Sequence, residues 1–248
     1  MRVSNVLITG ANRGLGLEFV KQFIILPSPP NFVFATCRDP SKAEDLQHIA
    51  KSNPTVKVLQ LDIKDEKSFP EIRKQLEQEI GPTGLNLLIN NAGVAIRTNL
   101  DNVTKEAMME NFEVNTVSPL LLSKELLPLL KTAASKSGND DLSCSRAAIV
   151  NITSKMGSID DNTSGGSYSY RTSKTALNMV TRSLSVDLKP HGILCFLLHP
   201  GWVQTDMGGK SGLITPTTSV SGMMNTILQA KEKHCGLMFN YDGKLIPW

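Results

Sequence analysis

Short apolar and β-branched runs alternate with longer segments of helical period along the whole chain of 248 residues. Runs that are apolar throughout, such as Val6–Ile8, suit strands that are buried on both faces, and strands of this kind are parallel strands covered by helices. The alternation therefore predicts an α/β fold, with one doubly wound parallel sheet of about seven strands and helices on both of its faces.

The predicted strands are Val3–Thr9, Phe32–Thr36, Val56–Leu61, Leu85–Ile89, Ala147–Thr153, Ile193–Leu198 and Leu237–Asn240, and the predicted helices are residues 15–26, 41–52, 66–80, 104–134, 168–189 and 218–231. No repeat or linker interrupts this series, so residues 1–248 are expected to form a single domain. The polar segment 135–145 is predicted to be a mobile surface insertion. Residues 201–217 are predicted to form a loop that closes as a lid over the substrate, because Gly208, Gly209 and Gly212 give it freedom to move.

Charge and hydropathy exclude several classes of function. The 26 basic and 23 acidic side chains give a net charge of +3, and no basic cluster would follow a phosphate backbone or an anionic bilayer. We therefore expect neither nucleic acid nor membrane as a partner. No stretch approaches the ~18–20 apolar residues of a membrane span, and the first apolar run is too short for a signal peptide. The expected location is the cytoplasm.

The four cysteines predict no special chemistry. Cys37, Cys144, Cys195 and Cys235 lie far apart, without a C-x-x-C pair or a histidine at ligand spacing. They are interpreted as free thiols, with no metal site and no disulfide framework.

A glycine-rich string follows the first predicted strand. Gly10, Gly14 and Gly16 lie between a buried strand and a helix, where bare backbone can approach a pyrophosphate and the helix N-terminus supplies N–H donors. A tight strand-to-helix turn without a ligand is the alternative. A dinucleotide-binding unit carries an acidic residue about 20 positions further on when it binds the ribose 2′-hydroxyl, but here Cys37 and Arg38 occupy those positions. Together with Arg13, Arg38 favours a 2′-phosphate, and hence NADP over NAD.

Small or polar residues also follow the other predicted strands, at the edge where open α/β sheets bind ligands. They are Asp62 and Ile63, which could contact an adenine, then Asn91, Ala92 and Gly93, and finally Pro200 and Gly201. Ordinary turns would explain any one of these groups, but they explain the whole pattern poorly.

A tyrosine and a lysine lie one helical turn apart in the segment Tyr170-Arg171-Thr172-Ser173-Lys174. A free phenol has a pKa near ~10, and a neighbouring cation would lower it toward the working pH of a general acid or base. Ser154, after a buried strand, could hold a carbonyl oxygen. Pro119 cannot donate to the backbone carbonyl of Asn115, which leaves that oxygen free for a water in a proton route. A simple turn and a helix kink are the alternatives for these two residues.

In this order, the motifs resemble the short-chain dehydrogenase/reductase family over nearly the whole chain: Thr9-Gly10-x-x-x-Gly14-x-Gly16, Asn90-Asn91-Ala92-Gly93, Asn115, Ser154, Tyr170-x-x-x-Lys174 and Pro200-Gly201. Finer details resemble the sniffer-type and C-factor-like carbonyl reductases, namely Asn12-Arg13-Gly14-Leu15-Gly16-Leu17, Thr36-Cys37-Arg38, His199-Pro200-Gly201-Trp202-Val203 and the ending Pro247-Trp248.

The resemblance implies a Rossmann-like domain that reduces an aldehyde or ketone with NADPH. Tyr170 would be the general acid, Lys174 would lower its pKa and hold the nicotinamide ribose, Ser154 would position the carbonyl and Asn115 would support the proton relay. The implied cofactor-binding residues are Gly10, Asn12, Arg13, Gly14, Leu15, Gly16, Arg38, Asp62, Ile63, Asn91, Ala92, Gly93, Tyr170, Lys174, Pro200, Gly201, Val203 and Thr205.

Two departures from the family pattern concern the substrate side. Thr153 precedes Ser154 where a second serine is more usual, and residues 160–166 lengthen the segment between Ser154 and Tyr170. The extra residues are expected to reshape the substrate pocket, so the substrates of the family are not assigned to this chain.

The alternatives are an NADP-dependent alcohol dehydrogenase that works oxidatively and a non-catalytic dinucleotide-binding sensor or scaffold. The second has no need for Tyr170, Lys174, Ser154 and Asn115 together, which counts against it. The helices predicted at 104–134 and 168–189 could pair subunits into a homodimer or homotetramer, or could be solvated.

Overall fold

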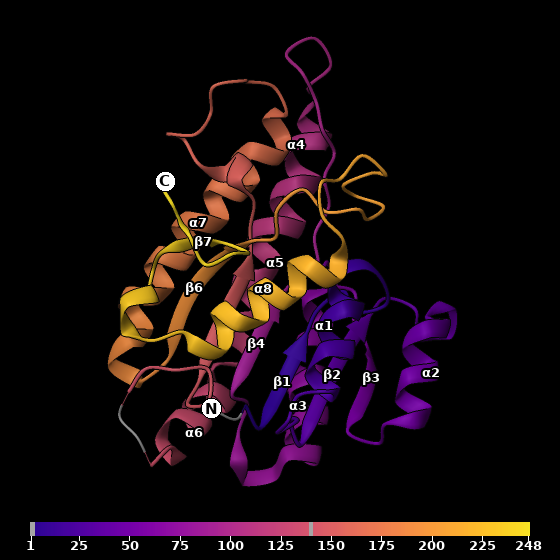
Figure 1. Ribbon diagram of the computed structural model, residues 1–248, viewed down its shortest axis with the longest axis vertical. Helices are drawn as coiled ribbons and strands as arrows, with labels where there is room; N and C mark the ends of the chain where they lie inside the picture. The colour runs from indigo at the N-terminus through magenta and orange to yellow at the C-terminus, as the bar shows by residue number, and fades with distance from the viewer. Residues whose placement is uncertain (1–2, 139–140) are drawn as a thin grey trace.

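The computed structural model describes residues 3–138 and 141–248, which fold around one eight-stranded sheet with the order β3-β2-β1-β4-β5-β6-β7-β8 (Figure 1). The pairs from β3 through β7 are parallel, and β8 joins β7 antiparallel. The predicted doubly wound sheet is confirmed, with one strand more than the seven expected. The strands are β1 (Asn5–Ile8), β2 (Phe32–Cys37), β3 (Val56–Gln60), β4 (Leu87–Asn90), β5 (Ala148–Ile152), β6 (Leu194–His199), β7 (Met238–Asn240) and β8 (Leu245–Ile246).

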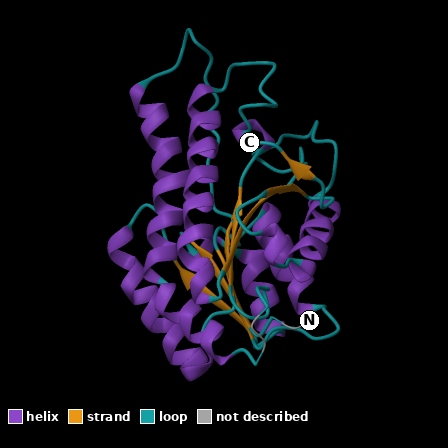
Figure 2. Ribbon diagram, turned by 90° about the vertical axis from the view of Figure 1, so that its left-hand side faces the viewer, coloured by secondary structure: helices purple, strands orange, loops and turns teal. Residues whose placement is uncertain are grey.

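Helices cover both faces of this sheet (Figure 2). The helices are α1 (Gly14–Ile24), α2 (Glu44–Ser52), α3 (Phe69–Ile80), α4 (Lys105–Phe112), α5 (Ser118–Glu125), α6 (Leu127–Lys136), α7 (Tyr168–Leu188) and α8 (Pro216–Gln229). Successive strand side chains point to opposite faces. In β1, Val6 and Ile8 therefore pack into the core under α1, α2 and α8, whereas Leu7 packs into the core under α3, α5 and α6.

The prediction of one continuous helix over residues 104–134 is wrong. The structure has α4, α5 and α6 there, with a π-helical segment at Glu113–Val117 between α4 and α5. Pro119 and Pro128 stand in the first turns of α5 and α6, where a missing backbone N–H is tolerated. The prolines that allow these two helices to begin also prevent one long helix.

The segment 135–145, predicted to be a mobile surface insertion, is only partly at the surface. Residues 139 and 140 lie outside the described residues, but Leu142, Ser143 and Cys144 are buried. Ser143 caps the start of β5, because its carbonyl oxygen accepts from the N–H groups of Arg146 and Ala147. The end of this polar segment therefore forms a turn that packs against the body of the protein.

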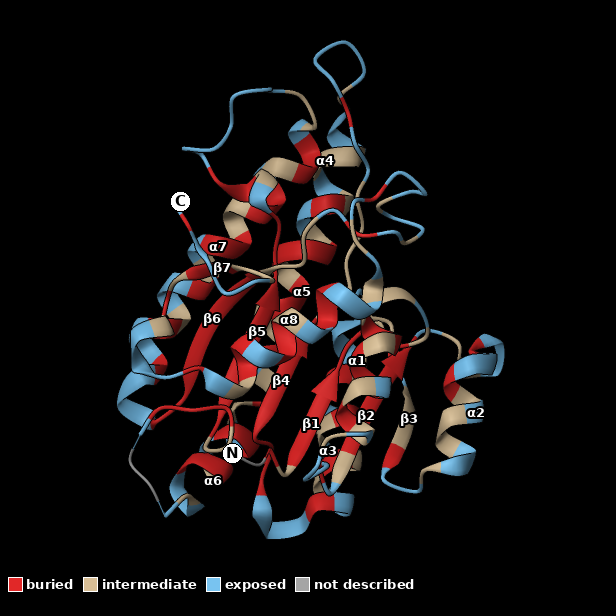
Figure 3. Cartoon of the chain, in the orientation of Figure 1, coloured by how far each residue is buried: buried red, intermediate tan, exposed pale blue. Residues whose placement is uncertain are grey.

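The sheet order reverses between β1 and β4, so that the chain leaves these neighbouring strands toward opposite sides. The loops after β1, β2, β3, β4, β5 and β6 gather at the carboxyl edge of the sheet, and Figure 3 shows exposed loops above buried strands. Open α/β sheets bind ligands in the crevice at such a switch point. In the described residues no helix is long and apolar enough to cross a membrane, and the cysteines are free.

Candidate active site

The glycine loop after β1 folds against the end of β4. Gly10 and Gly14 have φ angles of 65° and 54°, in the left-handed region that glycine adopts without strain. The Thr9 hydroxyl accepts from the backbone N–H groups of Asn91 and Ala92, each at 3.0 Å. A Cβ on Gly16 would overlap the carbonyl oxygen of Gly10. Glycine at this position therefore lets α1 begin directly against the loop.

The N-terminus of α1 opens into a cleft and is not capped by its own chain. Arg13, the residue before the helix, makes no side-chain hydrogen bond to the first turn. The first N–H groups of a helix lack partners within the helix and carry positive potential. This end of α1 is thus suited to an anion such as a pyrophosphate.

Most of the predicted cofactor residues line one cleft. They are Gly10, Asn12, Arg13, Gly14, Leu15, Arg38, Asp62, Ile63, Asn91, Ala92, Gly93, Tyr170, Lys174, Pro200 and Thr205. Gly16, Gly201 and Val203 lie behind this lining. Gly201 has a φ of 83° and packs against Ile214 and Tyr241, while Val203 is buried in a bridge with Ile214.

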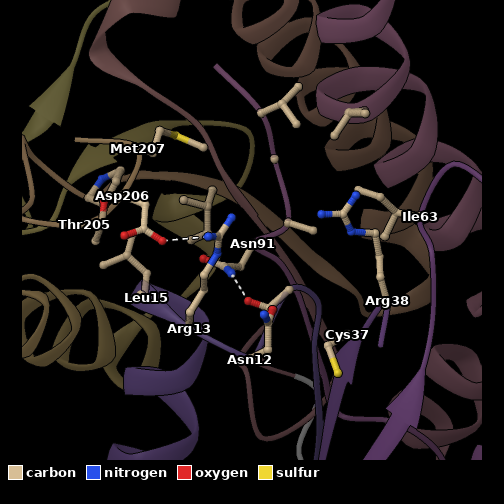
Figure 4. A pocket seen from close by; sticks show the side chains of 18 of the residues that line it. Asn12, Arg13, Leu15, Cys37, Arg38, Ile63, Asn91, Thr205, Asp206 and Met207 are labelled. Carbon is tan, nitrogen blue, oxygen red and sulfur yellow. Dashed lines mark hydrogen bonds and ion pairs between the residues drawn. The ribbon is translucent and has the colours of Figure 1, made fainter. Parts of the chain in front are cut away.

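Positive charge borders the cleft on two sides. Arg38 follows β2 and lies near Ile63, and Arg13 reaches across to Asp206, with Nη1 and Oδ2 2.7 Å apart (Figure 4). The carboxylate of Asp39 is not available to a ribose, because it accepts from the backbone N–H and the hydroxyl of Ser41. It also pairs with Lys42, and these contacts lower the pKa of Asp39 to about 2.

An ion pair that the sequence did not indicate forms part of the lining of the cleft. Lys64 Nζ lies 2.7 Å from Glu110 Oε2 on α4, and both residues line the cleft beside Asp62 and Ile63. The backbone N–H of Lys64 also donates to Asp62 Oδ1 at 3.0 Å. The sequence offered no signal for this pair, because its members are 46 residues apart.

Tyr170 and Lys174 line the cleft, and both are buried; Ser154, also buried, lies beside them and is in hydrogen-bond contact with the Tyr170 phenol. Lys174 Nζ lies 5.9 Å from the centroid of the Tyr170 ring and donates to the carbonyl oxygen of Ile152 at 2.9 Å. Ser154 stands directly after β5, where its hydroxyl oxygen accepts from the N–H of Met156 at 3.1 Å. The one-turn spacing of tyrosine and lysine thus brings both groups to the edge of β5.

Asn115 lies in the π-helical segment and connects α7 to the loop after β4. Its Oδ1 accepts from the N–H of Val94 at 3.0 Å, and its Nδ2 donates to the Ser173 hydroxyl at 3.0 Å. A Cβ on Gly93 would lie 2.9 Å from Asn115 Oδ1 and 3.6 Å from Lys174 Nζ. Only glycine leaves this space open between the asparagine and the lysine. π-helical turns are frequent at functional sites, where they displace one side chain from the regular helical path.

Burial dominates the electrostatics of this cluster. It raises the pKa of the Tyr170 phenol, while the hydrogen bond with Ser154 and the charge of Arg97 lower it. Burial also lowers the pKa of Lys174, to about 8. The expected lowering of the Tyr170 pKa by a cation is therefore outweighed in this structure, because removing the phenolate from water costs more than the nearby charges return.

Arg97, in the loop after β4, was not singled out from the sequence. Its Nη2 donates to the backbone carbonyl of Met207 at 3.4 Å, which ties this loop to the predicted lid. Thr205, Asp206 and Met207 of the 201–217 segment line the cleft. The cluster as a whole can donate a proton from a phenol, hold an oxygen with two hydroxyls and stabilise negative charge that develops on that oxygen.

Comparisons with known proteins agree with this geometry. The family model described as short chain dehydrogenase matches residues 4–228. The structure of the carbonyl reductase Sniffer of D. melanogaster is similar, with a TM-score of 0.98 and 43% identity, and that of an NADPH-bound carbonyl reductase from chicken fatty liver has a TM-score of 0.96 and 45% identity. Both alignments cover 100% of either chain. The C-signal protein of Myxococcus xanthus is 41% identical over 165 residues, which are 66% of this chain and 93% of that protein.

Replacing the buried lysine is expected to stabilise the protein. Because the folded-state pKa of Lys174 is lowered from 10.5 to about 8, Lys174→Met should raise the free energy of unfolding at pH 7 by up to about 3 kcal/mol. The lost hydrogen bond to Ile152 reduces this gain. Between these two pKa values the unfolded chain binds more protons, so the wild-type stability should rise with pH from about 8 to 10.5.

Denaturant unfolding at pH 7 and at pH 10 measures this effect, and the gap between the two proteins should narrow at pH 10. Lys131→Met, at an exposed position in α6, serves as the matched control and should open no such gap. A gap of equal size at both pH values would contradict the assignment of the penalty to the buried ammonium.

Proposed function

The chain belongs to the short-chain dehydrogenase family, and on that premise we propose that this oxidoreductase reduces an aldehyde or ketone with NADPH. The observation that carries the proposal is that Tyr170, hydrogen-bonded to the buried Ser154, and Lys174 line the same cleft as the glycine loop and Arg38. The name carbonyl reductase, given to the two solved structures described above, favours reduction over oxidation.

The residues of the cleft fit NADPH. The uncapped end of α1 and the glycine loop offer backbone N–H groups to the pyrophosphate. Ile63 and Asp62 would hold the adenine, and Arg38 would bind the 2′-phosphate at the end of β2, where Asp39 is turned away. Arg13 would join Arg38, because its exposed ion pair with Asp206 is weak and is readily exchanged for a phosphate.

When bound, the cofactor supplies the hydride through its nicotinamide. The chain supplies the proton and the electrostatic stabilisation. Ser154 and Tyr170 would donate hydrogen bonds to the carbonyl oxygen of the substrate, which becomes negative as the carbon is reduced. Tyr170 would then give its phenolic proton to that oxygen.

Lys174 would have two roles in the reaction. Its ammonium, held against β5 by Ile152, would stabilise the phenolate that remains on Tyr170. It would also bind the nicotinamide ribose from the same position. Asn115 would keep Gly93 and α7 at a fixed separation, and its backbone carbonyl, to which Pro119 cannot donate, would hold a water that returns the proton from solvent.

Removing the phenol hydroxyl tests the catalytic role of Tyr170. Tyr170→Phe should lower kcat for reduction of carbonyl compounds by about 10²–10⁴-fold, the usual contribution of a general acid. The NADPH affinity should change little, because the ring is kept. Tyr168→Phe is the matched control, since Tyr168 is exposed and has Thr172 where Tyr170 has Lys174. Equal rates for Tyr170→Phe and wild type, by NADPH absorbance, would remove Tyr170 from this role.

Reversing the charge at the end of β2 tests the cofactor choice. Arg38→Asp should weaken NADPH by at least about tenfold, because a charge-assisted hydrogen bond is lost and a repulsion is introduced. NADH, which lacks the 2′-phosphate, should keep its affinity or gain. Lys51→Asp, an equal charge change at an exposed position of α2, is the control for long-range electrostatics. Fluorescence titrations that give unchanged affinities for both cofactors would contradict the role of Arg38.

A further inference from the structure

The loop that joins Ser154 to Tyr170, residues 155–167, has little regular structure. A single 3₁₀ turn, Lys155–Gly157, begins it, and residues 159–165 are exposed. Both ends of the loop adjoin side chains assigned to the reaction. Together with the loops after β4 and β6, it rises above the carboxyl edge of the sheet (Figure 1). We therefore expect any movement of this loop to change the space beside Ser154 and Tyr170.

The last turn of the loop holds an unfavourable backbone conformation. Gly165, Gly166 and Ser167 have φ angles of 61°, 63° and 49°, and Ser167 is the only described residue other than glycine with a positive φ. A non-glycine residue in this region costs about 1–2 kcal/mol. Such strain persists when the surroundings over-determine the conformation, and it tends to occur at functional sites. A partner outside the turn must therefore hold it.

Arg171, the residue after Tyr170, supplies that partner. Its Nε donates to the carbonyl oxygens of Gly165 and Gly166, each at 3.2 Å. Its Nη1 donates to the carbonyl oxygen of Met156 at 3.3 Å, and its Nη2 donates to the Ser164 hydroxyl at 2.8 Å. One guanidinium thus joins the beginning of the loop, two residues after Ser154, to its end, just before α7.

We propose that Arg171 is a positioning residue that clamps the 155–167 loop and so fixes the substrate wall between Ser154 and Tyr170. The proposal deepens the proposed function, on which its kinetic test rests. Guanidinium is the group that suits this task, because its donors lie in a rigid planar fork and reach acceptors in several directions. A lysine ammonium is a point charge and cannot span Met156, Ser164 and the two glycines together.

The other contacts of the loop are weaker or lie at one point only. Lys155 pairs with Asp161 at 3.0 Å on the surface, where an ion pair contributes little. The N–H of Asp160 donates to the carbonyl oxygen of Trp248 at 2.8 Å, which fixes the middle of the loop. The carbonyl oxygen of Gly157 accepts from the Thr175 hydroxyl at 2.9 Å and from Asn178 Nδ2 at 3.1 Å, which fixes the start of the loop to α7. None of these contacts reaches residues 164–166, so the joining of the two ends depends on Arg171.

The clamp should affect large substrates more than small ones. A carbonyl compound of a few carbons would contact only the groups around Tyr170, whereas a larger one would also contact the loop. A wall that is already ordered does not lose conformational entropy when the substrate binds. Loosening the loop should therefore raise KM for a large substrate and leave kcat nearly unchanged.

The test uses full-length protein with Arg171→Met and Arg171→Lys, and Arg182→Met as the matched control in an exposed position of the same helix. Amide hydrogen exchange of residues 158–166 should be at least about tenfold faster in both Arg171 variants and unchanged in the control. KM for a two-ring aromatic ketone should rise by about tenfold. KM for a three-carbon aldehyde, kcat and the pH profile of kcat should stay close to wild type.

Unchanged exchange in the loop would overturn the proposal. A wild-type profile for Arg171→Lys would do the same, because it would show that the charge matters and the fork does not. A shifted pH profile with unchanged KM would instead mean that the guanidinium acts electrostatically on Tyr170. If Arg171→Met fails to fold, the exchange and KM measurements on Arg171→Lys test the proposal in its place. Absence of any carbonyl reduction by wild type would refute the proposed function, while the exchange measurement would still decide the clamp.

Discussion

A seam of buried polar side chains between α7 and β5 determines where the reactive groups lie. The Thr153 hydroxyl donates to Asn178 Oδ1 at 2.7 Å, and Asn151 Nδ2 donates to the Thr181 hydroxyl at 2.7 Å. Lys174 adds a third contact near the end of the strand. A shift of α7 along β5 would break all of these bonds and leave buried donors and acceptors unpaired, at a cost of about 1–3 kcal/mol each. The helix therefore has one register, and Tyr170 has one position.

The same seam explains why a cation can be buried here at all. An unpaired ammonium in an apolar interior is very unfavourable, and the lowered pKa of Lys174 records the part of this cost that remains. The carbonyl oxygen of Ile152 and the open space at Gly93 leave the ammonium aimed at the cleft. Burial raises the pKa of Tyr170 for the same reason. Two neighbouring groups are thus both biased toward their neutral forms, and negative charge that develops on the phenol would raise the pKa of Lys174 again.

Much of this arrangement could be predicted from local sequence, because the relevant signals are short. The apolar runs identified the parallel strands, and the spacing of Tyr170 and Lys174 placed both on one helical face. The seam could not be predicted. Polar residues such as Asn178 and Thr181 in a helical pattern are ordinarily assigned to solvent, and only the polar side chains of β5, 30 residues earlier in the case of Asn151 and Thr181, make them buried. Strand β8 was not predicted, because a strand of only two residues shows no hydrophobic periodicity in the sequence.

The conformation of the loops that would select the substrate could not be predicted from the sequence for a related physical reason. Arginines hold them through contacts that join distant parts of the chain. Arg13 meets Asp206 across 193 residues and Arg97 meets Met207 across 110. Arg171 acts over a shorter span, but its acceptors are mostly backbone carbonyls, which every residue offers. No residue type at the receiving end marks such a contact in the sequence. In the proposed function, substrate choice would therefore depend on guanidinium groups whose neighbours only the folded chain defines, whereas the chemistry would depend on a helix whose Tyr170–Lys174 spacing is visible in the sequence.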